Sequence, residues 1–196
     1  MKPYLMKMNH FRVYAITAVT TLLLAVCMKA SSQNSAGSRD LPLLDLHGPV
    51  KSVVMDTPQT GEATFLFDRT GRLISIDDET IIADCDPKYN PEGRLKEFYM
   101  WMAINSASYQ NGHLYKFRSD YRLGTEIYIF TYNANGEIVK ITKKEGDATD
   151  DEKDMQATTI PITILQRDSH GNWTKCKYPN AWGGIEIKER TIIYYE

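Results

Sequence analysis

A short turn motif recurs along this chain: an aromatic residue, then Asp or Asn, then a closing glycine. The copies are Phe67–Gly71, Tyr89–Gly93, Tyr109–Gly112 and Tyr132–Gly136, with Arg167–Gly171 lacking the aromatic residue and Asp45–Gly48 as a degenerate first copy. Successive glycines lie 23, 22, 19, 24 and 35 residues apart. A period in the twenties is typical of repeat architectures, although unrelated turns in an all-β protein would also give turn residues of this kind. The pattern predicts the architecture and leaves the function open.

The motif predicts one β-hairpin per copy. Asp or Asn at the first turn position accepts hydrogen bonds from N–H groups further along the chain, and glycine adopts the left-handed conformation of a bulged hairpin. We therefore expect five structural turn glycines: Gly71, Gly93, Gly112, Gly136 and Gly171. The residue before the turn and the apolar residue two positions after the glycine should form a cross-strand pair.

Alternation of apolar and polar residues predicts about eleven short strands and no substantial helix. The expected strands are residues 50–54, 63–67, 73–76, 80–85, 95–104, 114–117, 126–133, 137–143, 158–165, 173–178 and 185–195. Residues 95–104 are apolar on both faces, which indicates a strand buried on both sides. The predicted fold is all-β, an antiparallel meander of repeated hairpins that forms an open curved sheet rather than a closed barrel.

The N-terminus resembles an export signal. Lys2, Lys7 and Arg12 precede an apolar run of 14 residues, from Val13 to Val26. As a helix this run would be about 21 Å long, too short for the roughly 30 Å hydrocarbon core of a membrane. It therefore fits a removable signal peptide.

The small residues Ala30 and Ser32 favour cleavage before Gln33, whereas Val26 fits poorly in a lipobox that would acylate Cys27. The predicted organisation is a signal peptide (1–32), a flexible leader (33–43) and one hairpin-repeat domain (44–196). We expect an exported protein that is periplasmic, on the outer surface or extracellular, with no transmembrane segment after signal removal. Lipidation of Cys27 is the alternative.

The mature chain is acidic. Removing residues 1–32 removes four of the 23 Lys and Arg and none of the 25 Asp and Glu, which leaves a net charge of −6. This balance argues against nucleic acid or an anionic membrane as a partner, because both require a clustered basic patch.

An acidic insertion, residues 145–154, explains the longest spacing between glycines. Carboxylates at alternate positions could wrap a calcium ion, but their spacing differs from that of the twelve-residue calcium loop. The sequence favours a mobile, solvated hairpin tip.

No catalytic or metal-binding pattern is evident. His47, His113 and His170 lie in or beside repeat turns without zinc-ligand spacing, and Asp77–Glu79 is interpreted as another turn. Motifs for nucleophilic, metalloprotease or phosphate-binding sites are missing from the sequence. We therefore expect no cofactor and no enzymatic activity, although β-sheet enzymes can assemble sites from scattered carboxylates.

The best candidates for contact with a ligand are Tyr178 and Trp182, on a loop rich in turn-forming residues. Such rings can stack on sugars or anchor a protein partner. The alternative is that Trp182 folds back over one end of the core.

The two mature cysteines, Cys85 and Cys176, lie about six strands apart in a simple meander. At about 4.8 Å per strand this is about 29 Å, far above the limit of about 7 Å for a disulfide. Two free thiols are expected.

The turns resemble the YD repeats of Rhs-type bacterial proteins. Leu46–Val53, Asp168–Lys175 and Arg190–Tyr195 are similar to segments of small exported Rhs-like proteins of Bacteroidota. The resemblance implies a β-repeat shell and supplies no catalytic residue. Large Rhs proteins enclose a toxin, but this chain has too few repeats to do so.

The sequence thus predicts a secreted or envelope-associated protein that acts by binding a protein or glycan, or by structural display. A carbohydrate-processing or other hydrolase with an unrecognised carboxylate site, and a toxin accessory or immunity factor, are the alternatives.

Overall fold

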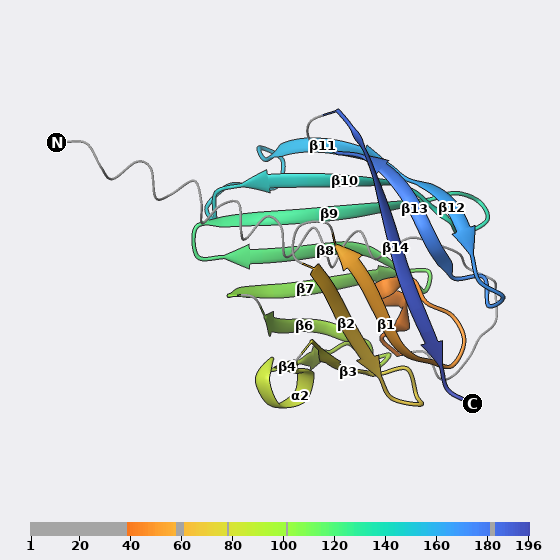
Figure 1. Cartoon of the computed structure of the whole chain (residues 1–196). Coiled ribbons are helices and arrows are strands. Elements are labelled where there is room, and N and C mark those ends of the chain that lie inside the picture. The colour runs from red at the N-terminus through yellow and green to blue at the C-terminus, as the bar shows by residue number, and fades with distance from the viewer. Residues whose placement is uncertain (1–38, 58–60, 78, 101, 181–182) are drawn as a thin grey trace.

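The computed structural model describes residues 39–57, 61–77, 79–100, 102–180 and 183–196, which form fourteen strands in two antiparallel sheets (Figure 1). The first sheet has the order β12 (Thr163–Arg167), β13 (Trp173–Pro179), β14 (Ile185–Tyr194), β1 (Val50–Thr57), β2 (Gly61–Phe67), β3 (Leu73–Ile76) and β4 (Glu79–Thr80). The second has the order β11 (Gln156–Pro161), β10 (Ile138–Gly146), β9 (Gly124–Tyr132), β8 (His113–Tyr121), β7 (Ala103–Gln110), β6 (Leu95–Met100) and β5 (Lys88–Tyr89).

The two sheets stack with their strands crossing steeply, and one hydrophobic core lies between them (Figure 1). Neither sheet closes into a barrel. The predicted all-β, open, antiparallel fold is confirmed, although it comprises two sheets rather than one.

The first and last strands pair with each other within the first sheet. β14 pairs with β1, the central strand of that sheet, so the two halves of the sheet come from opposite ends of the described sequence. Val50 pairs with Tyr194, and Gly48 has a φ of 84°. The degenerate first copy therefore completes its motif with an aromatic residue from the last strand.

The repeat turns have the predicted geometry. All five glycines have positive φ, from 73° at Gly136 to 87° at Gly112. The five predicted cross-strand pairs are present: Phe67–Leu73, Tyr89–Leu95, Tyr109–Leu114, Tyr132–Ile138 and Arg167–Trp173. A shift in strand register lies beside each pair, as a bulged hairpin requires.

Side chains close these turns as expected. The Asp68 carboxylate accepts hydrogen bonds from the N–H groups of Thr70 (2.8 Å) and Arg72 (3.0 Å). Asn90, Asn133 and Asp168 each accept a hydrogen bond from the residue after their glycine. The Tyr109–Gly112 copy is shorter because Asn111 and Gly112 both have positive φ, which is the two-residue type I′ turn.

Two of the predicted strands are each divided into two strands in the structure. Residues 95–104 contain all of β6, a turn at Met102 (φ 60°) and the start of β7. Tyr99 and Ile104 point to solvent, so burial on both faces is wrong. Apolar residues occupy both alternating sets of positions in this segment because two different strands contribute to it. Residues 158–165 divide at Ile162 into β11 and β12, which belong to different sheets.

Two short helical segments occur in the described part of the chain. Residues 80–85, predicted to be a strand, contain the helix α2 (Ile81–Asp84). The Asp84 carboxylate accepts a hydrogen bond from Thr80 N (2.8 Å), and Cys85 N donates to Ile81 O (3.2 Å), which favours a helical turn. The other segment is a 3-10 turn, η1 (Leu41–Leu44). Neither is long and apolar enough to span a membrane.

The predicted flexible leader is wrong for residues 39–43. Leu41, Leu43, Leu44 and Leu46 are fully buried in the core. Asp40 accepts hydrogen bonds from Leu73 N (2.9 Å) in the first sheet and Leu95 N (2.7 Å) in the second. We call residues 40–46 the terminal segment; it joins the two sheets at the end where the repeat turns gather. The signal peptide, Cys27 and residues 33–38 lie outside the described residues.

Candidate ligand-binding site

Charged residues interrupt the inner face of the second sheet, at the ends of its strands remote from the repeat turns. On β9, Glu126 lies on the same face of the strand as Tyr128 and Phe130. On β10, Lys143 and Glu145 lie on the same face as Ile141. Tyr128, Phe130 and Ile141 belong to the core. Because side chains alternate along a strand, the charged residues also face inward. We call Glu126, Tyr128, Lys143 and Glu145 the inner charged cluster.

The cluster is connected by direct contacts. The Lys143 ammonium lies 3.1 Å from Glu126 Oε1 and 2.5 Å from Glu145 Oε1. The Tyr128 hydroxyl donates a hydrogen bond to Glu126 Oε2 (3.1 Å), and Lys143 Nζ lies 5.7 Å from the centre of the Tyr128 ring. Glu126 and Glu145 stand directly opposite each other on neighbouring strands. Lys143 therefore neutralises part of the charge of two adjacent carboxylates.

Exposure increases across the cluster. The side chains of Glu126 and Lys143 are 8% and 11% exposed, whereas that of Glu145 is 41% exposed. Burial raises the pKa of Glu126 above its ordinary value, and the neighbouring ammonium of Lys143 opposes this change. The cluster thus extends from solvent into the interior.

Polar residues continue the same row on β7 and β8. Ser119 pairs with Glu126 and with Asn105, and both Ser119 and Asn105 are fully buried. The Ser119 hydroxyl donates to Asn105 Oδ1 (2.7 Å), while the Asn105 amide donates to Met100 O (3.1 Å). Burial, followed by the nearby negative charge of Glu126, raises the pKa of Tyr121. The inner face here is polar across four strands.

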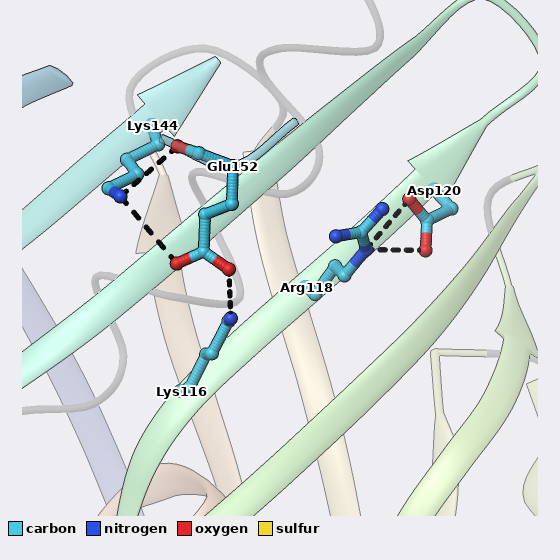
Figure 2. Close-up of polar contacts among 5 residues, drawn as sticks. All are labelled: Lys116, Arg118, Asp120, Lys144 and Glu152. Carbon is cyan, nitrogen blue, oxygen red and sulfur yellow. Dashed lines mark hydrogen bonds and ion pairs between the residues drawn. The ribbon is translucent and has the colours of Figure 1, made fainter. Parts of the chain in front are cut away.

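The outer face of the same strands carries a separate set of ion pairs (Figure 2). Glu152, from the acidic insertion, contacts Lys116 on β8 and lies 3.6 Å from Lys144 Nζ on β10, so it bridges β9. Beside it, Arg118 Nε donates to Asp120 (2.8 Å). The acidic insertion is therefore fixed to the sheet at Glu152 rather than being only a solvated tip.

The acidic insertion also packs closely at its start. A Cβ atom on Gly146 would lie 2.8 Å from both Asp150 Oδ2 and Met155 Cγ, and Met155 is buried. Residues 145–154 hold no group of three or more acidic, His or Cys side chains placed to bind a metal ion, and the same is true of the other described residues.

Of the two predicted ligand contacts, the structure describes only Tyr178, and Tyr178 does not lie at the surface. Tyr178 lies in β13 rather than on a loop, its ring is 5% exposed in the core, and its hydroxyl bonds to Glu186. The expected loop position of Tyr178 is therefore wrong. Trp182 lies outside the described residues.

A further repeat turn occupies this region and was missed. Gly183 has a φ of 78°, Gly183 N donates to Asn180 O (3.1 Å), and Asn180 Oδ1 accepts from Gly184 N (2.8 Å). The sequence indicated this turn through Asn180, which lies three residues before a glycine as in the other copies. The aromatic residue Tyr178 lies two residues before Asn180, whereas in the other copies it lies directly before the Asp or Asn.

The three histidines gather near the repeat turns. His170 stacks on Tyr194 at 3.9 Å between ring centres, and His113 lies 4.6 Å from the Tyr132 ring. The backbone of His47 exchanges hydrogen bonds with the Asn172 side chain. These contacts connect the Asp45–Gly48 copy to the Arg167–Gly171 copy, and the Tyr109–Gly112 copy to the Tyr132–Gly136 copy.

Neither Cys85 nor Cys176 forms a disulfide, as expected, and both side chains are buried. The reason differs from the one proposed, because the chain does not follow one meander from Cys85 to Cys176.

The inner charged cluster itself was not predicted. The signal was present in the strand alternation, where Glu126 shares the phase of Tyr128 and Phe130, and Lys143 and Glu145 share the phase of Ile141. Charged residues at strand positions that otherwise carry inward-facing apolar residues indicate either a buried ion pair or a functional site.

A shallow groove of about 460 Å³ lies between the start of β10 and β12. Val139 and Leu165 line it, as do Arg167 and Glu137, which form an ion pair (2.9 Å). It marks the point where the two sheets separate. Its charged side chains are already paired to each other, so it is the weaker candidate.

Comparison with known proteins gives no identification. The sequence matches no protein-family model, and it matches no curated protein significantly.

Proposed function

We propose that this chain is an exported binding protein of the YD-repeat type that recognises a hydroxyl-rich ligand, such as a glycan, at the inner charged cluster. One observation carries the proposal: three charged side chains in contact extend from the exposed Glu145 to the buried Glu126. Burying charge is costly, and an apolar core of similar volume is often at least as stable. Such clusters are therefore found preferentially at functional sites.

The chemistry of the cluster fits sugar hydroxyl groups. The carboxylates of Glu126 and Glu145 can accept hydrogen bonds from hydroxyl groups, and the Lys143 ammonium can donate to sugar oxygens. The repeat assignment is supported by the capped turns and by the aromatic–apolar pairs, which have the geometry that the resemblance implies.

A glycan array probed with the purified protein tests the proposal. Lys143 and Lys144 are neighbours on opposite faces of β10, so Lys143→Met should abolish binding while Lys144→Met retains it. Glu126→Gln should also abolish binding. The double variant Glu126→Gln, Lys143→Met leaves no buried charge at these two positions, and melting curves establish that it is folded.

Two results would contradict the proposal. If the wild-type protein binds no glycan on the array, the ligand class is wrong. If binding persists in the folded double variant, the cluster is a structural ion-pair network. Export is tested separately by N-terminal sequencing, which should find Gln33; a lipidated Cys27 would contradict cleavage before Gln33.

Hydrolysis of a bound glycan is the second candidate function. It is favoured by the adjacent carboxylates of Glu126 and Glu145, because most glycoside hydrolases use a carboxylate pair. Lys143 weakens this candidate, since its ammonium is already ion-paired with both carboxylates. Release of a chromophore from aryl glycosides, lost in Glu126→Gln and in Glu145→Gln, would establish hydrolysis.

A further inference from the structure

The edge strand β11 is unusually free of charge. Residues 155–166, which include β11 and most of β12, contain no Asp, Glu, Lys or Arg, although 24% of the whole chain is charged. In the described part of the chain β11 pairs only with β10, and every residue of β11 except the half-buried Ile160 is exposed. Edge strands usually carry charges that prevent pairing with other chains.

Backbone hydrogen bonding defines which groups of β11 are open. Ile162 N donates to Val139 O (3.1 Å), so Ile162 belongs to a hydrogen-bonded pair. Because the pattern alternates, Ile160 and Thr158 also bond to β10, whereas Ala157, Thr159 and Pro161 direct their backbone groups away from the sheet. The open edge therefore offers the N–H and C=O groups of Ala157 and Thr159 and the carbonyl of Pro161.

We propose that two copies of this chain pair antiparallel through β11, around a two-fold axis at Thr159. The two Thr159 residues exchange both backbone hydrogen bonds. Each Ala157 N–H donates to the Pro161 carbonyl of the second copy, so the missing N–H of Pro161 does not prevent pairing. The second sheets of the two copies then form one continuous sheet.

Charge favours a second copy in this orientation. A two-fold interface must be self-complementary, and an uncharged strand meets this condition in an acidic protein. Antiparallel pairing keeps the two acidic insertions at opposite ends of the joined strands. Each insertion then lies toward Lys140 of the second copy, which stands opposite Pro161 on β10. Parallel pairing would place the two insertions side by side.

Sedimentation velocity with matched variants tests the interface. Thr159→Pro removes the central N–H group of the open edge and leaves the hydrogen bonds to β10 intact, so it should weaken the dimer at least tenfold. Thr159→Val retains that N–H group and should dimerise like the wild type. Melting curves of both variants should match that of the wild type at a protein concentration low enough for the wild type to be monomeric, because dimerisation itself raises the melting temperature. A wild-type protein that stays monomeric at the highest concentration measured, or a Thr159→Pro variant that still dimerises, would overturn the proposal.

Cross-linking tests the position of the axis. Facing residues in a hydrogen-bonded antiparallel pair have Cα atoms about 5.5 Å apart, within the range for a disulfide. Thr159→Cys should therefore form an intermolecular disulfide on oxidation. Gln156→Cys is the control, since two copies of that residue would lie about 20 Å apart. Cys85 and Cys176 are buried and do not compete. Equal cross-linking of the two variants would mean that β11 pairs with a different register or not at all.

Discussion

At the scale of single residues, Gly93 shows why each repeat closes on glycine. Its φ is 77°, and an added Cβ would meet only the flexible Arg39 side chain, at 3.9 Å. Space is therefore available, and only the backbone conformation restricts the residue. Gly93→Val should lower the free energy of unfolding by about 1–3 kcal/mol, measured by urea denaturation. Gly93→Asn should cost less, because Asn tolerates this conformation. Equal losses would mean that conformation is not the cause.

Also at this scale, Asp45 and His47 give opposing pH dependences. Burial raises the pKa of Asp45 from 3.8 to about 7, against the nearby positive charge of Arg190. Between these values the folded state holds a proton that the unfolded state has released, so stability falls as pH rises. Burial lowers the pKa of His47 from 6.5 to about 4. Between those values only the unfolded state holds the proton, so stability rises with pH.

The two effects offset each other in the wild type between about pH 4 and 6.5, and single substitutions separate them. In Asp45→Asn, stability should rise with pH across this interval, by up to about 1.4 kcal/mol per pH unit. In His47→Gln, stability should fall between about pH 4 and 7 with a similar limiting slope. Urea denaturation at steps of pH measures both slopes. Variants with the same pH profile as the wild type would show that neither group titrates differently on folding.

At the scale of elements, tyrosines connect two of the repeats to the one before. The Tyr109 hydroxyl donates to Leu95 O (2.9 Å), and the Tyr132 hydroxyl donates to Leu114 O (2.6 Å). In both cases the acceptor is the apolar residue of the preceding copy. Tyr132→Phe should destabilise the fold by about 1 kcal/mol, because the bond is lost and a buried carbonyl stays unpaired. Tyr115→Phe, on an exposed ring, is the control and should have little effect. Comparable losses in thermal melts would argue against the bond.

The sequence predicted hairpins better than it predicted how they assemble. The cross-strand pairs followed from local turn chemistry, since Asp or Asn and a glycine determine the turn and its register. The split at Ile162 and the pairing of β14 with β1 depend on contacts between distant segments. No local pattern records such contacts. Glu126 and Lys143 could be recognised in the sequence as charged residues at alternating positions that are otherwise apolar. Their contact could not be predicted, because it depends on the register between β9 and β10.

At the scale of the whole molecule, the terminal segment makes the two sheets interdependent. Its leucines fill the core, and Arg190 on β14 donates hydrogen bonds to Leu44 O (2.9 Å) and Trp173 O (2.6 Å). Asp40 bonds to both sheets. The segment precedes the first strand, yet its hydrogen bonds connect it to β3, β6 and β14. The two sheets should therefore unfold in one transition.

Asp40 offers a direct test of this interdependence. Asp40→Ala leaves the buried N–H groups of Leu73 and Leu95 unpaired, one in each sheet, and should lower the free energy of unfolding by about 2–4 kcal/mol. Asp84→Ala is the matched control, because Asp84 bonds to Thr80 N from an exposed position and should cost less than about 1 kcal/mol. Urea denaturation followed by tryptophan fluorescence and by far-UV circular dichroism measures both losses. If Asp40→Ala costs no more than Asp84→Ala, the carboxylate does not join the sheets. Non-coincident transitions would show that the two sheets unfold independently.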